Sequence, residues 1–393
     1  MYRISMPELP IHTPRVLFDI SRLVRSRTKS FGTGVDRIDL AIGLDLLRRF
    51  DTRCHFICAA GRGFSLLPWS LGKNLLLGLD GAWNGSQLKP LTREADDPFR
   101  WLLQRSVGRL FFQPRNEVIS TETTYVVASH SGIGKIRGGM NRLDPRQKMR
   151  RVVYIHDLIP LDYPEYQRPE TFRQFTDYLT ELADAPVFII ANSEDTEKRV
   201  KSYAKLHNWS LMGTEIAIPR LRLHSASSAP LSESLSLFLH DPSPYFVILG
   251  TIEPRKNHML LLQIWRELSQ LQAAPRLCIV GKRGWENENV FDMLERCLPL
   301  KGCVFEFSGL TDFEVQTLLQ DAKALLFPSF AEGLGIPVLE AAALNVPCIL
   351  SDIPVFREIA PPGTVFLSPL DGIGWKREIL ALADDIGERR YVS

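Results

Sequence analysis

Short apolar runs alternate along the chain with segments in which apolar residues recur every three or four positions. The first run, residues 16–20, predicts a buried strand, and a loop containing Gly32 and Gly34 follows it. Beyond that loop, the apolar residues at 35, 38, 42 and 46 share one face of a helix. Strands interleaved with helices indicate βαβ units and a mostly parallel sheet. Further strands of this sheet are predicted at 124–128, 152–155 and 187–191.

The alternation becomes more regular after a break at 225–244. This break contains seven serines and three prolines, which is typical of a linker or an exposed loop. Beyond it, residues 245–372 show the pattern of a doubly wound parallel sheet. The predicted strands are 245–249, 276–280, 304–307, 324–327 and 348–351, and the predicted helices are 258–271, 292–297, 311–321 and 338–344.

We therefore predict an α/β protein with two Rossmann-like domains, at 1–225 and 245–372, joined by a linker at 226–244. Residues 373–393 are expected to form a C-terminal helix that packs back on the N-terminal domain. Two doubly wound units in tandem place a cleft between the carboxyl ends of their sheets. Residues 60–120 show no clear pattern, and we expect an insertion of helical or irregular structure there.

The composition disfavours several other classes of protein. Hydrophobic residues make up 45% and charged residues 23%, which argues against disorder, collagen-like repeats or a coiled coil along the whole chain. The six cysteines form no CxxC pair, which favours buried free thiols over disulfides or a metal site. We expect neither a signal peptide nor a membrane-spanning segment, because the start has no apolar core and no apolar run is long enough to cross a bilayer. We expect a cytoplasmic protein, with peripheral contact at the inner face of the plasma membrane left open.

The net charge of +2 conceals an uneven distribution. Residues 1–150 hold 24 Lys+Arg and 13 Asp+Glu, a balance of +11, whereas residues 151–393 hold 23 and 32, a balance of −9. Such asymmetry suggests different partners for the two parts. The basic front fits an anionic membrane surface or a solvated face, and both interpretations remain open. No nucleic acid partner is expected, because no recognisable motif is present. The clustered basic residues are Arg22, Arg25, Arg27, Lys29, Arg48 and Arg49.

The segment 327–340, FPSFAEGLGIPVLE, carries the strongest candidate chemistry. A buried strand leads into a loop with two glycines, and Pro337 then suits the first position of a helix. This order presents free backbone N–H groups to a phosphate or diphosphate. Glu332 lies in the loop and Glu340 lies inside the helix. The alternative is a plain strand–turn–helix with a solvated Glu at each place.

A second candidate, Arg255 and Lys256, follows the strand predicted at 245–249 and precedes a helix. Arg can hold two phosphate oxygens at once, and Lys acts as a point charge. Alone, the pair is compatible with a solvated helix start. Together with the acidic glycine loop, it indicates a diphosphate donor whose leaving oxygens need positive charge, which is the main electrostatic task in nucleotide-sugar chemistry.

These motifs resemble those of family-4 glycosyltransferases, which have the GT-B fold of two Rossmann-like domains facing a cleft. Glu332 and Glu340 form the Glu-x7-Glu signature of that family. The other matching segments of the C-terminal half are GTIEPRKN, CIVGKRGW, SGLTD and SDIPVFRE. The N-terminal half resembles members that assemble bacterial polysaccharide and lipopolysaccharide. Its matching segments are FDISRL, TGVDRI, YIHDLIPLDYPEY and IIANSEDT.

The resemblance implies a role for each matching residue. Arg255 and Lys256 would neutralise the donor diphosphate, Glu332 would contact hydroxyls of the donor sugar, and Glu340 would bond the ribose. His156 would come from the N-terminal domain to the reacting centre. The family retains the anomeric configuration, and its favoured mechanism is front-face substitution. No metal or other cofactor is expected, because the basic pair and the helix N-terminus take the charge and no DxD motif follows a strand.

Further candidates come from the same segments, and several have a structural alternative. Glycines can serve turns alone, Asp157 can cap a turn, and Asn192-Ser193 can cap a helix. Asn345 stands where the family often has a left-handed Gly, for which Asn is the next-best residue. The further donor-binding candidates are Gly281, Arg283, Ser329, Gly333, Leu334 and Gly335, and the candidates for the acceptor or the cleft loops are Gly32, Gly34, Asp157, Asn192 and Ser193.

The expected function is hexosyl transfer from a nucleotide sugar to a glycan or lipid-linked glycan in surface polysaccharide synthesis. GDP-mannose is the first donor to test, because VGKRGW resembles mannosyl- and rhamnosyl-type transferases. UDP- and dTDP-sugars come next. Two alternatives are kept: a catalytically silent paralogue that binds glycans or acts as a scaffold, and a nucleotide-sugar epimerase on the same fold.

Overall fold

The computed structural model describes residues 2–5, 11–29, 32–60, 63–83, 118–130, 132, 136, 138–223 and 230–384. The chain divides into two compact units, residues 2–224 and residues 225–393. Each unit is built around its own sheet, and each sheet is mostly or wholly parallel.

The N-terminal unit contains a seven-stranded sheet in the order β4-β3-β2-β5-β6-β7-β8. Neighbouring strands are parallel, as predicted, except for the antiparallel pair β3 and β4. β2, β5 and β7 are buried almost throughout, which explains why they are continuous apolar runs. A separate antiparallel pair joins β1 (Tyr2–Ser5) and β9 (Arg220–Leu223). The strands of the main sheet are β2 (Arg15–Asp19), β3 (Cys54–Ala60), β4 (Gly63–Leu67), β5 (Thr123–Val127), β6 (Arg150–Ile155), β7 (Val187–Ala191) and β8 (Leu211–Ile216).

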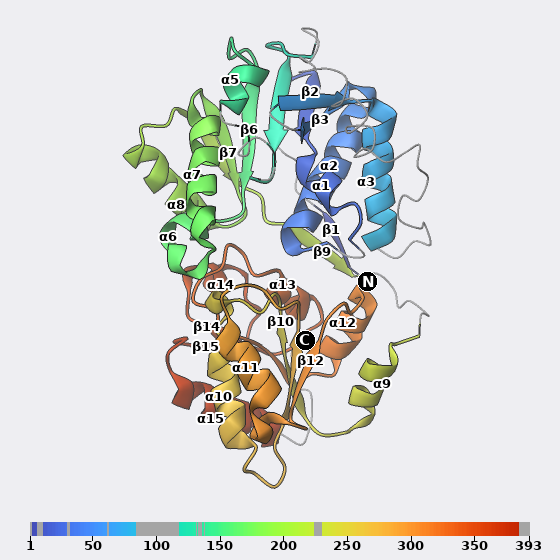
Figure 1. Cartoon of the computed structure of the whole chain (residues 1–393), viewed down its shortest axis with the longest axis vertical. Helices are drawn as coiled ribbons and strands as arrows, with labels where there is room; N and C mark the ends of the chain where they lie inside the picture. The colour runs from blue at the N-terminus through green and yellow to red at the C-terminus, as the bar shows by residue number, and fades with distance from the viewer. Residues whose placement is uncertain are drawn as a thin grey trace. The chain divides into compact units, whose positions relative to one another are not determined.

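Helices cover both faces of this sheet, with α1, α2 and α3 on one side and α7 and α8 on the other (Figure 1). α2 begins at a complete capping box formed by Thr33 and Asp36. Its buried face includes Ile38, Ile42 and Leu46, as the periodicity predicts. The helices are α1 (Ser21–Ser26), α2 (Gly34–Phe50), α3 (Trp69–Trp83), α5 (Gly139–Leu143), α6 (Ile159–Asp162), α7 (Pro169–Ala183) and α8 (Glu194–Leu206).

The C-terminal unit contains a six-stranded sheet, parallel throughout, in the order β12-β11-β10-β13-β14-β15. The chain starts at the central strand β10, moves outward to β12 and then crosses to β13 on the other side of β10. β10 and β13 therefore flank the topological switch point, where sheets of this kind bind their ligands. The strands are β10 (Tyr245–Leu249), β11 (Arg276–Val280), β12 (Val304–Phe307), β13 (Ala324–Phe327), β14 (Cys348–Ser351) and β15 (Val365–Leu367).

One apolar core fills the C-terminal unit. Trp265 and Trp375 are fully buried, and their indole N–H groups donate to backbone carbonyls. Asn345, just after α13, has a φ of 54°, which confirms the left-handed conformation predicted there. The helices are α9 (Glu233–His240), α10 (His258–Leu268), α11 (Glu288–Arg296), α12 (Asp312–Gln320), α13 (Ile336–Ala343), α14 (Pro354–Ile359) and α15 (Gly372–Asp384).

The prediction of a linker at 226–244 is wrong for much of its length, because this segment contains helix α9. Leu235 and Phe238 of α9 belong to the core of the C-terminal unit. The buried guanidinium of Arg276, at the start of β11, donates to the carbonyls of Phe238, Asp241 and Ser243 at 2.6–2.7 Å. Alternating Ser and Leu conceal this helix in the sequence, and the arginine that fixes it lies on a distant strand.

The expectation for the C-terminal helix is also corrected. α15 packs on α10 within its own unit and buries Trp375 and Ile379 there. An ion pair between Lys376 and Glu267, 2.7 Å long, joins the two helices at the surface. Residues 385–393 of the predicted helix lie outside the described residues.

Part of the stretch 60–120 is regular structure. β4 pairs with β3, and α3 packs on α2. Gly72 allows α3 to approach the sheet, because a Cβ at this position would lie 2.1 Å from the ring of Phe56. Residues 84–117 lie outside the described residues.

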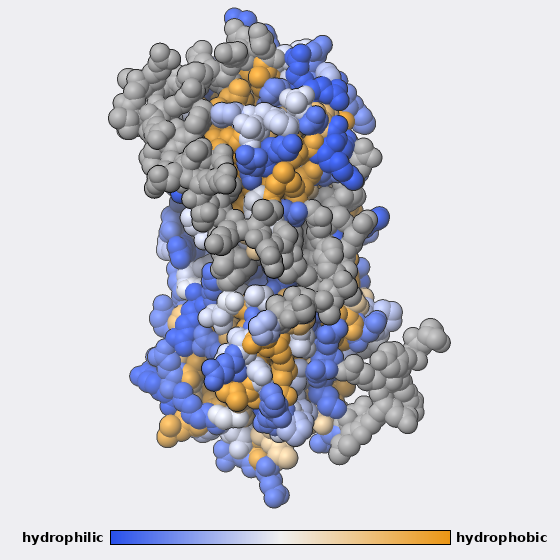
Figure 2. Space-filling model, turned by 90° about the vertical axis from the view of Figure 1, so that its right-hand side faces the viewer, coloured by the Kyte–Doolittle hydropathy of each residue, from blue (hydrophilic) through white to orange (hydrophobic). Residues whose placement is uncertain are grey.

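Within the ranges that the structure describes, no helix combines the length and the apolar character needed to cross a bilayer. On the face drawn in Figure 2, apolar residues form separate patches among hydrophilic ones. Large exposed apolar side chains come from different elements, for example Leu77 of α3, Phe172 of α7 and Ile373 of α15.

Candidate active site

Two loops at the switch point of the C-terminal sheet carry the candidate residues. After β10, Gly250 has a φ of 129° and the chain enters a 3-10 turn, Pro254–Lys256, that ends at left-handed Asn257. The side-chain amide of Asn257 donates to the carbonyl of Pro369 at 2.9 Å and ties this loop to the segment after β15. The second loop follows β13 and leads into α13. Because β10 and β13 are neighbours, both loops leave the same edge of the sheet at adjacent positions.

Side chains from the two loops meet at the carboxylate of Glu332. Arg255 Nη1 lies 2.7 Å from Glu332 Oε2, and Lys256 Nζ lies 2.6 Å from Glu332 Oε1. Ser329 Oγ donates to the same Oε1 at 2.9 Å. The predicted residues Arg255, Lys256, Ser329 and Glu332 are thus brought together in one cluster.

Backbone contacts hold the two loops together. The amide of Phe330 donates to the carbonyl of Arg255 at 2.8 Å, and Arg255 Nη1 donates to the carbonyl of Ala331 at 2.9 Å. Lys256 Nζ lies over the ring of Phe327, 4.3 Å from its centroid. The cationic groups are therefore fixed in position before any ligand arrives.

The cluster keeps Glu332 ionised. Burial opposes the charge on its carboxylate, but the attraction of Arg255 and Lys256 outweighs burial and lowers the pKa of Glu332 to about 2. Only 6–7% of the Glu332 and Lys256 side chains is exposed. Such charges interact strongly, because little water screens them.

A second acidic residue, Glu253, completes the cluster and was missed by the sequence analysis. Its Oε1 lies 2.6 Å from Nη2 of Arg255, and only 4% of its side chain is exposed. Two cations therefore face two carboxylates. Glu253 is part of the GTIEPRKN segment, but nothing in the sequence indicates that its side chain turns back on Arg255.

Helix α13 begins beside this cluster, with Gly335 at its N-cap. Gly335 has a φ of 95°, and a Cβ there would lie 2.8 Å from the ring of Phe356, so this position needs glycine. Leu334 and Gly333 are buried just before the helix. Glu340 is buried farther along α13, and burial raises its pKa to about 8.

The two candidates after β11 differ in what the structure assigns to them. Gly281 approaches the first loop so closely that a Cβ would lie 1.8 Å from the carbonyl oxygen of Gly250. Arg283 instead pairs with Glu306 of β12 at 2.9 Å and with Glu295 of α11. It is therefore not part of the Glu332 cluster.

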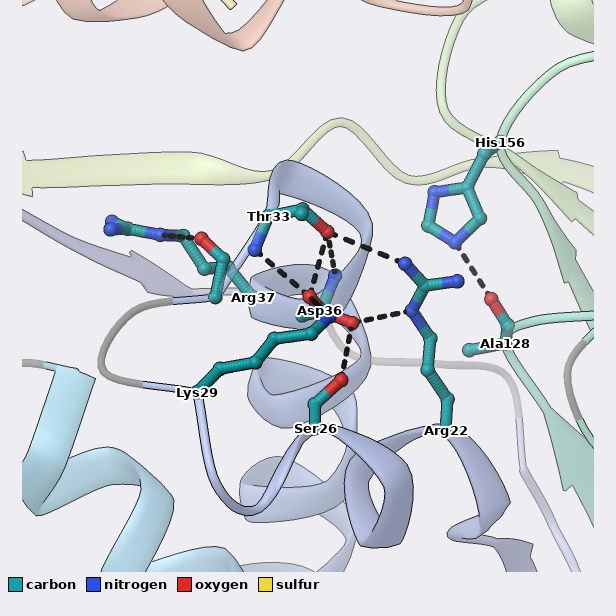
Figure 3. Close-up of polar contacts among 9 residues, drawn as sticks. Arg22, Ser26, Lys29, Thr33, Asp36, Arg37, Ala128 and His156 are labelled. Carbon is teal, nitrogen blue, oxygen red and sulfur yellow. Dashed lines mark hydrogen bonds and ion pairs between the residues drawn. The ribbon is translucent and has the colours of Figure 1, made fainter. Parts of the chain in front are cut away.

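In the N-terminal unit, an ion-pair network centred on the buried carboxylate of Asp36 lies at the start of α2 (Figure 3). Arg22 Nε donates to Asp36 Oδ1 at 2.7 Å, and Lys29 Nζ donates to Oδ2 at 2.8 Å. The Thr33 amide and the Ser26 hydroxyl donate to the same carboxylate. The attraction of Arg22 outweighs the burial of Asp36 and holds the pKa of Asp36 far below its usual range.

Glycines 32 and 34 frame the start of α2 in this network. Gly34 is the first residue of the helix, and the carbonyl of Gly32 accepts a hydrogen bond from Arg37 Nε at 3.1 Å. A Cβ on Gly32 would lie 2.8 Å from the ring of Trp83. Packing therefore requires Gly32 independently of any ligand.

His156 lies just beyond the carboxyl end of β6. Its Nε2 lies 2.7 Å from the carbonyl oxygen of Ala128, as Figure 3 shows, and its own carbonyl accepts a hydrogen bond from Asn192 at 2.7 Å. Burial lowers the pKa of His156 to about 3, so the imidazole is neutral. Asp157 accepts from the amide of Ile159, and Ser193 caps α8 by accepting from the amide of Thr196.

No group of three or more His, Cys, Asp or Glu side chains arranged to hold a metal ion occurs among the described residues. All six cysteines are free, and five are buried, in agreement with the expectation of buried thiols.

Comparison with known proteins finds a family whose match includes both loops of the Glu332 cluster. Residues 236–385 match the family described as glycosyl transferases group 1. Serotype-specific mannosyltransferase WbdA of Escherichia coli is 30% identical over 214 residues, which cover 52% of this chain and 26% of that protein. O-antigen chain mannosyltransferase B of Escherichia coli is 28% identical over 258 residues, 63% of this chain and 65% of that protein. The chain thus spans about a quarter of the length of the first of these relatives.

A solved structure extends the similarity to both units. Anabaena Alr3699/HepE in complex with UDP-glucose covers 95% of this chain and 90% of its own, with a TM-score of 0.58. At 14% sequence identity this likeness establishes the fold alone. Together with the family match, it confirms the predicted GT-B fold of two Rossmann-like units.

Proposed function

We propose that this chain, whose residues 236–385 match glycosyl transferases group 1, moves a hexosyl unit from a nucleotide sugar to a glycan or lipid-linked glycan. The observation that carries the proposal is the cluster of Arg255, Lys256 and Glu332 at the switch point of the C-terminal sheet. It combines two fixed cations with an ionised carboxylate where such sheets bind nucleotides.

Arg255 and Lys256 are suited to the diphosphate of the donor. When the bond between the sugar and the diphosphate breaks, negative charge grows on the leaving oxygens, and positioned cations stabilise it. The Arg255 guanidinium can hold two oxygens, and Lys256 supplies a point charge. Because hydrogen bonds already fix both side chains, little reorganisation is needed when the donor binds.

The two glutamates of the signature suit different hydroxyl groups of the donor. Glu332 is ionised and therefore accepts hydrogen bonds, which fits hydroxyls of the donor sugar. Glu340 holds its proton at neutral pH because it is buried, so it can both donate to and accept from a ribose hydroxyl.

We propose mannose as the hexose and GDP-mannose as the first donor, with transfer that retains the anomeric configuration. Two relatives named as mannosyltransferases support this choice, and one is named for the O-antigen chain. The acceptor oxygen would bond to the anomeric carbon as the bond to the diphosphate breaks on the same face. The acceptor proton would pass to the leaving phosphate, and the two cations of the cluster would make a metal unnecessary.

Transfer assays with purified chain test this function. GDP-mannose and UDP- and dTDP-sugars are offered with lipid-linked glycan acceptors, and both product and released nucleoside diphosphate are measured. We expect Lys256→Ala and Glu332→Ala to lower the rate by at least about 100-fold while the chain stays folded. Lys198→Ala, which changes an exposed lysine on α8, serves as the control.

Other outcomes point elsewhere. Full activity in either variant would overturn the assignment of that residue. An epimerised nucleotide sugar in place of a glycoside would indicate an epimerase, and no reaction or binding with any donor would favour a silent paralogue. Proton NMR of the new anomeric signal reports retention or inversion, and addition of EDTA tests whether a metal is needed.

A further inference from the structure

Glu253 is a buried acid in the loop after β10, and the proposed chemistry does not use it. Its carboxylate contacts Nη2 of Arg255 at 2.6 Å, and only 3% of the residue is exposed. A buried carboxylate costs folding free energy unless it is paired, so this placement requires its partner. The partner is the guanidinium that we assign to the donor diphosphate.

The backbone around Glu253 is fixed by the neighbouring loop after β11. The amide of Ile252 donates to the carbonyl of Lys282 at 2.9 Å, and the amide of Gly284 donates to the carbonyl of Ile252 at 3.0 Å. A Cβ on Gly284 would lie 2.8 Å from the carbonyl oxygen of Ile252, so the two loops approach each other closely here. Glu253 therefore projects from an anchored segment.

The two ends of the Arg255 guanidinium are divided between different acceptors. Nη1 binds Glu332 and the carbonyl of Ala331, whereas Nη2 binds Glu253. If Glu332 turns to the hydroxyls of a donor sugar, the contact with Glu253 still orients Arg255. We propose that Glu253 is a positioning residue that holds the Arg255 guanidinium for the diphosphate. This inference rests on the proposed function.

The charge of Glu253 allows two effects on nucleotide binding to be distinguished, electrostatic repulsion and the orientation of Arg255. Removing a carboxylate beside a phosphate site strengthens anion binding if electrostatics alone decides. If orientation decides, the loss of Glu253 weakens binding, because Arg255 loses the group that fixes its plane. The direction of the change therefore separates the two explanations.

Calorimetric titration of GDP, UDP and dTDP into the purified chain tests this. With the nucleotide that binds the wild type best, we expect Glu253→Ala to weaken binding at least tenfold, about 1.4 kcal/mol. Glu253→Gln should stay within about threefold of wild type, because its amide oxygen still accepts from Arg255 without the charge. In an Arg255→Ala background, Glu253→Ala should cause no further loss, since Glu253 acts through Arg255.

Circular dichroism and thermal unfolding verify that each variant is folded. If Glu253→Ala does not fold, Glu253→Asp replaces it, because its shorter side chain keeps the charge but falls short of Arg255. The proposal is overturned if Glu253→Ala, or Glu253→Asp where it takes its place, binds the nucleotide as well as or better than wild type. Equal losses in the presence and absence of Arg255 also overturn it. A wild-type chain that binds none of the three nucleotides overturns the proposed function itself, and this inference with it.

Discussion

Glu332 and Glu340 show how the surroundings of a side chain decide its charge. Both are buried, but Glu332 meets two cations and a hydroxyl, and its pKa falls to about 2. Burial dominates at Glu340 and raises its pKa to about 8. The sequence shows both residues and their spacing, but not this difference, because the cations around Glu332 come from a loop that is distant in the chain.

The raised pKa of Glu340 has a consequence for stability. The unfolded chain ionises this residue near its ordinary pKa of 4.5, whereas the folded chain keeps the proton until about pH 8. Glu340 therefore destabilises the fold progressively as the pH rises from about 5 to about 8. We expect Glu340→Gln to gain stability relative to wild type across this window, measured by urea unfolding at pH 5 and pH 8. A difference between the two proteins that does not change with pH would contradict this.

The site depends on the close approach of the loops that follow the neighbouring strands β10 and β11. Gly281 lies so near Gly250 that any side chain would displace the segment leading to Arg255. Gly281 was predicted as a donor contact, and the structure gives it a packing role. Neighbouring strands cannot be identified from a single sequence, so this close approach was not predictable.

We expect Gly281→Ala to destabilise the C-terminal unit by about 1–3 kcal/mol and to weaken nucleotide binding, because backbone atoms must move. Gly372→Ala is the matched control, since a Cβ there would stand 3.4 Å from one methyl group of Leu260. Thermal unfolding and nucleotide titration report the two effects. Wild-type behaviour of Gly281→Ala would show that the loops are not in contact.

Arg276 fixes helix α9 to the C-terminal unit, and this contact is also testable. Arg276→Met would leave the carbonyls of Phe238, Asp241 and Ser243 without their buried donor. We expect a loss of at least about 2 kcal/mol in unfolding free energy, since charged hydrogen bonds are the stronger kind. Amide hydrogen exchange across 233–240 should become faster than in Arg266→Met, which alters the exposed side of α10. Unchanged exchange would mean that the apolar face of α9 suffices.

Across the whole chain, several basic residues of the N-terminal part pair with acidic side chains, so fewer of them can bind a partner than the sequence suggests. Arg22 and Lys29 bind buried Asp36, and Arg48 and Arg49 pair with Asp45. The sequence shows these charges but not their pairing, because pairing depends on which side chains the fold brings together. The basic front therefore offers fewer free charges to a membrane than its balance of +11 implies.

We still propose membrane contact through the exposed basic side chains, and we expect it to be weak. Co-sedimentation with vesicles containing anionic lipid should show binding at low salt that disappears at high salt. Arg25→Glu should reduce this binding, whereas Arg296→Glu in the C-terminal unit should not. No salt-sensitive binding to anionic vesicles would remove the membrane from the account.

Much of the architecture was predictable, because buried parallel strands consist of short apolar runs that are visible in the sequence. The runs around β2, β5, β7 and β10 lie within a residue of the observed strands. The loops bearing Arg255 and Glu332 were predicted because each follows such a run. Three features were not predictable: helix α9, the pairing of Arg283 and the contact of Glu253 with Arg255. The first two depend on residues that are distant in the sequence, and the third depends on the direction in which the Glu253 side chain points.

We propose that Arg255 and Lys256 bind the diphosphate of a nucleotide sugar while Glu332 contacts its sugar hydroxyls, and thermal unfolding with donors present measures this binding. A ligand at 100 times its Kd stabilises the folded chain by about 2.7 kcal/mol. We expect GDP-mannose, or one of the UDP- and dTDP-sugars, to raise the Tm of the wild-type chain by a few degrees. Lys256→Ala should lose this rise, and Lys198→Ala should keep it. No rise with any donor, or an equal rise in Lys256→Ala, would contradict the claim.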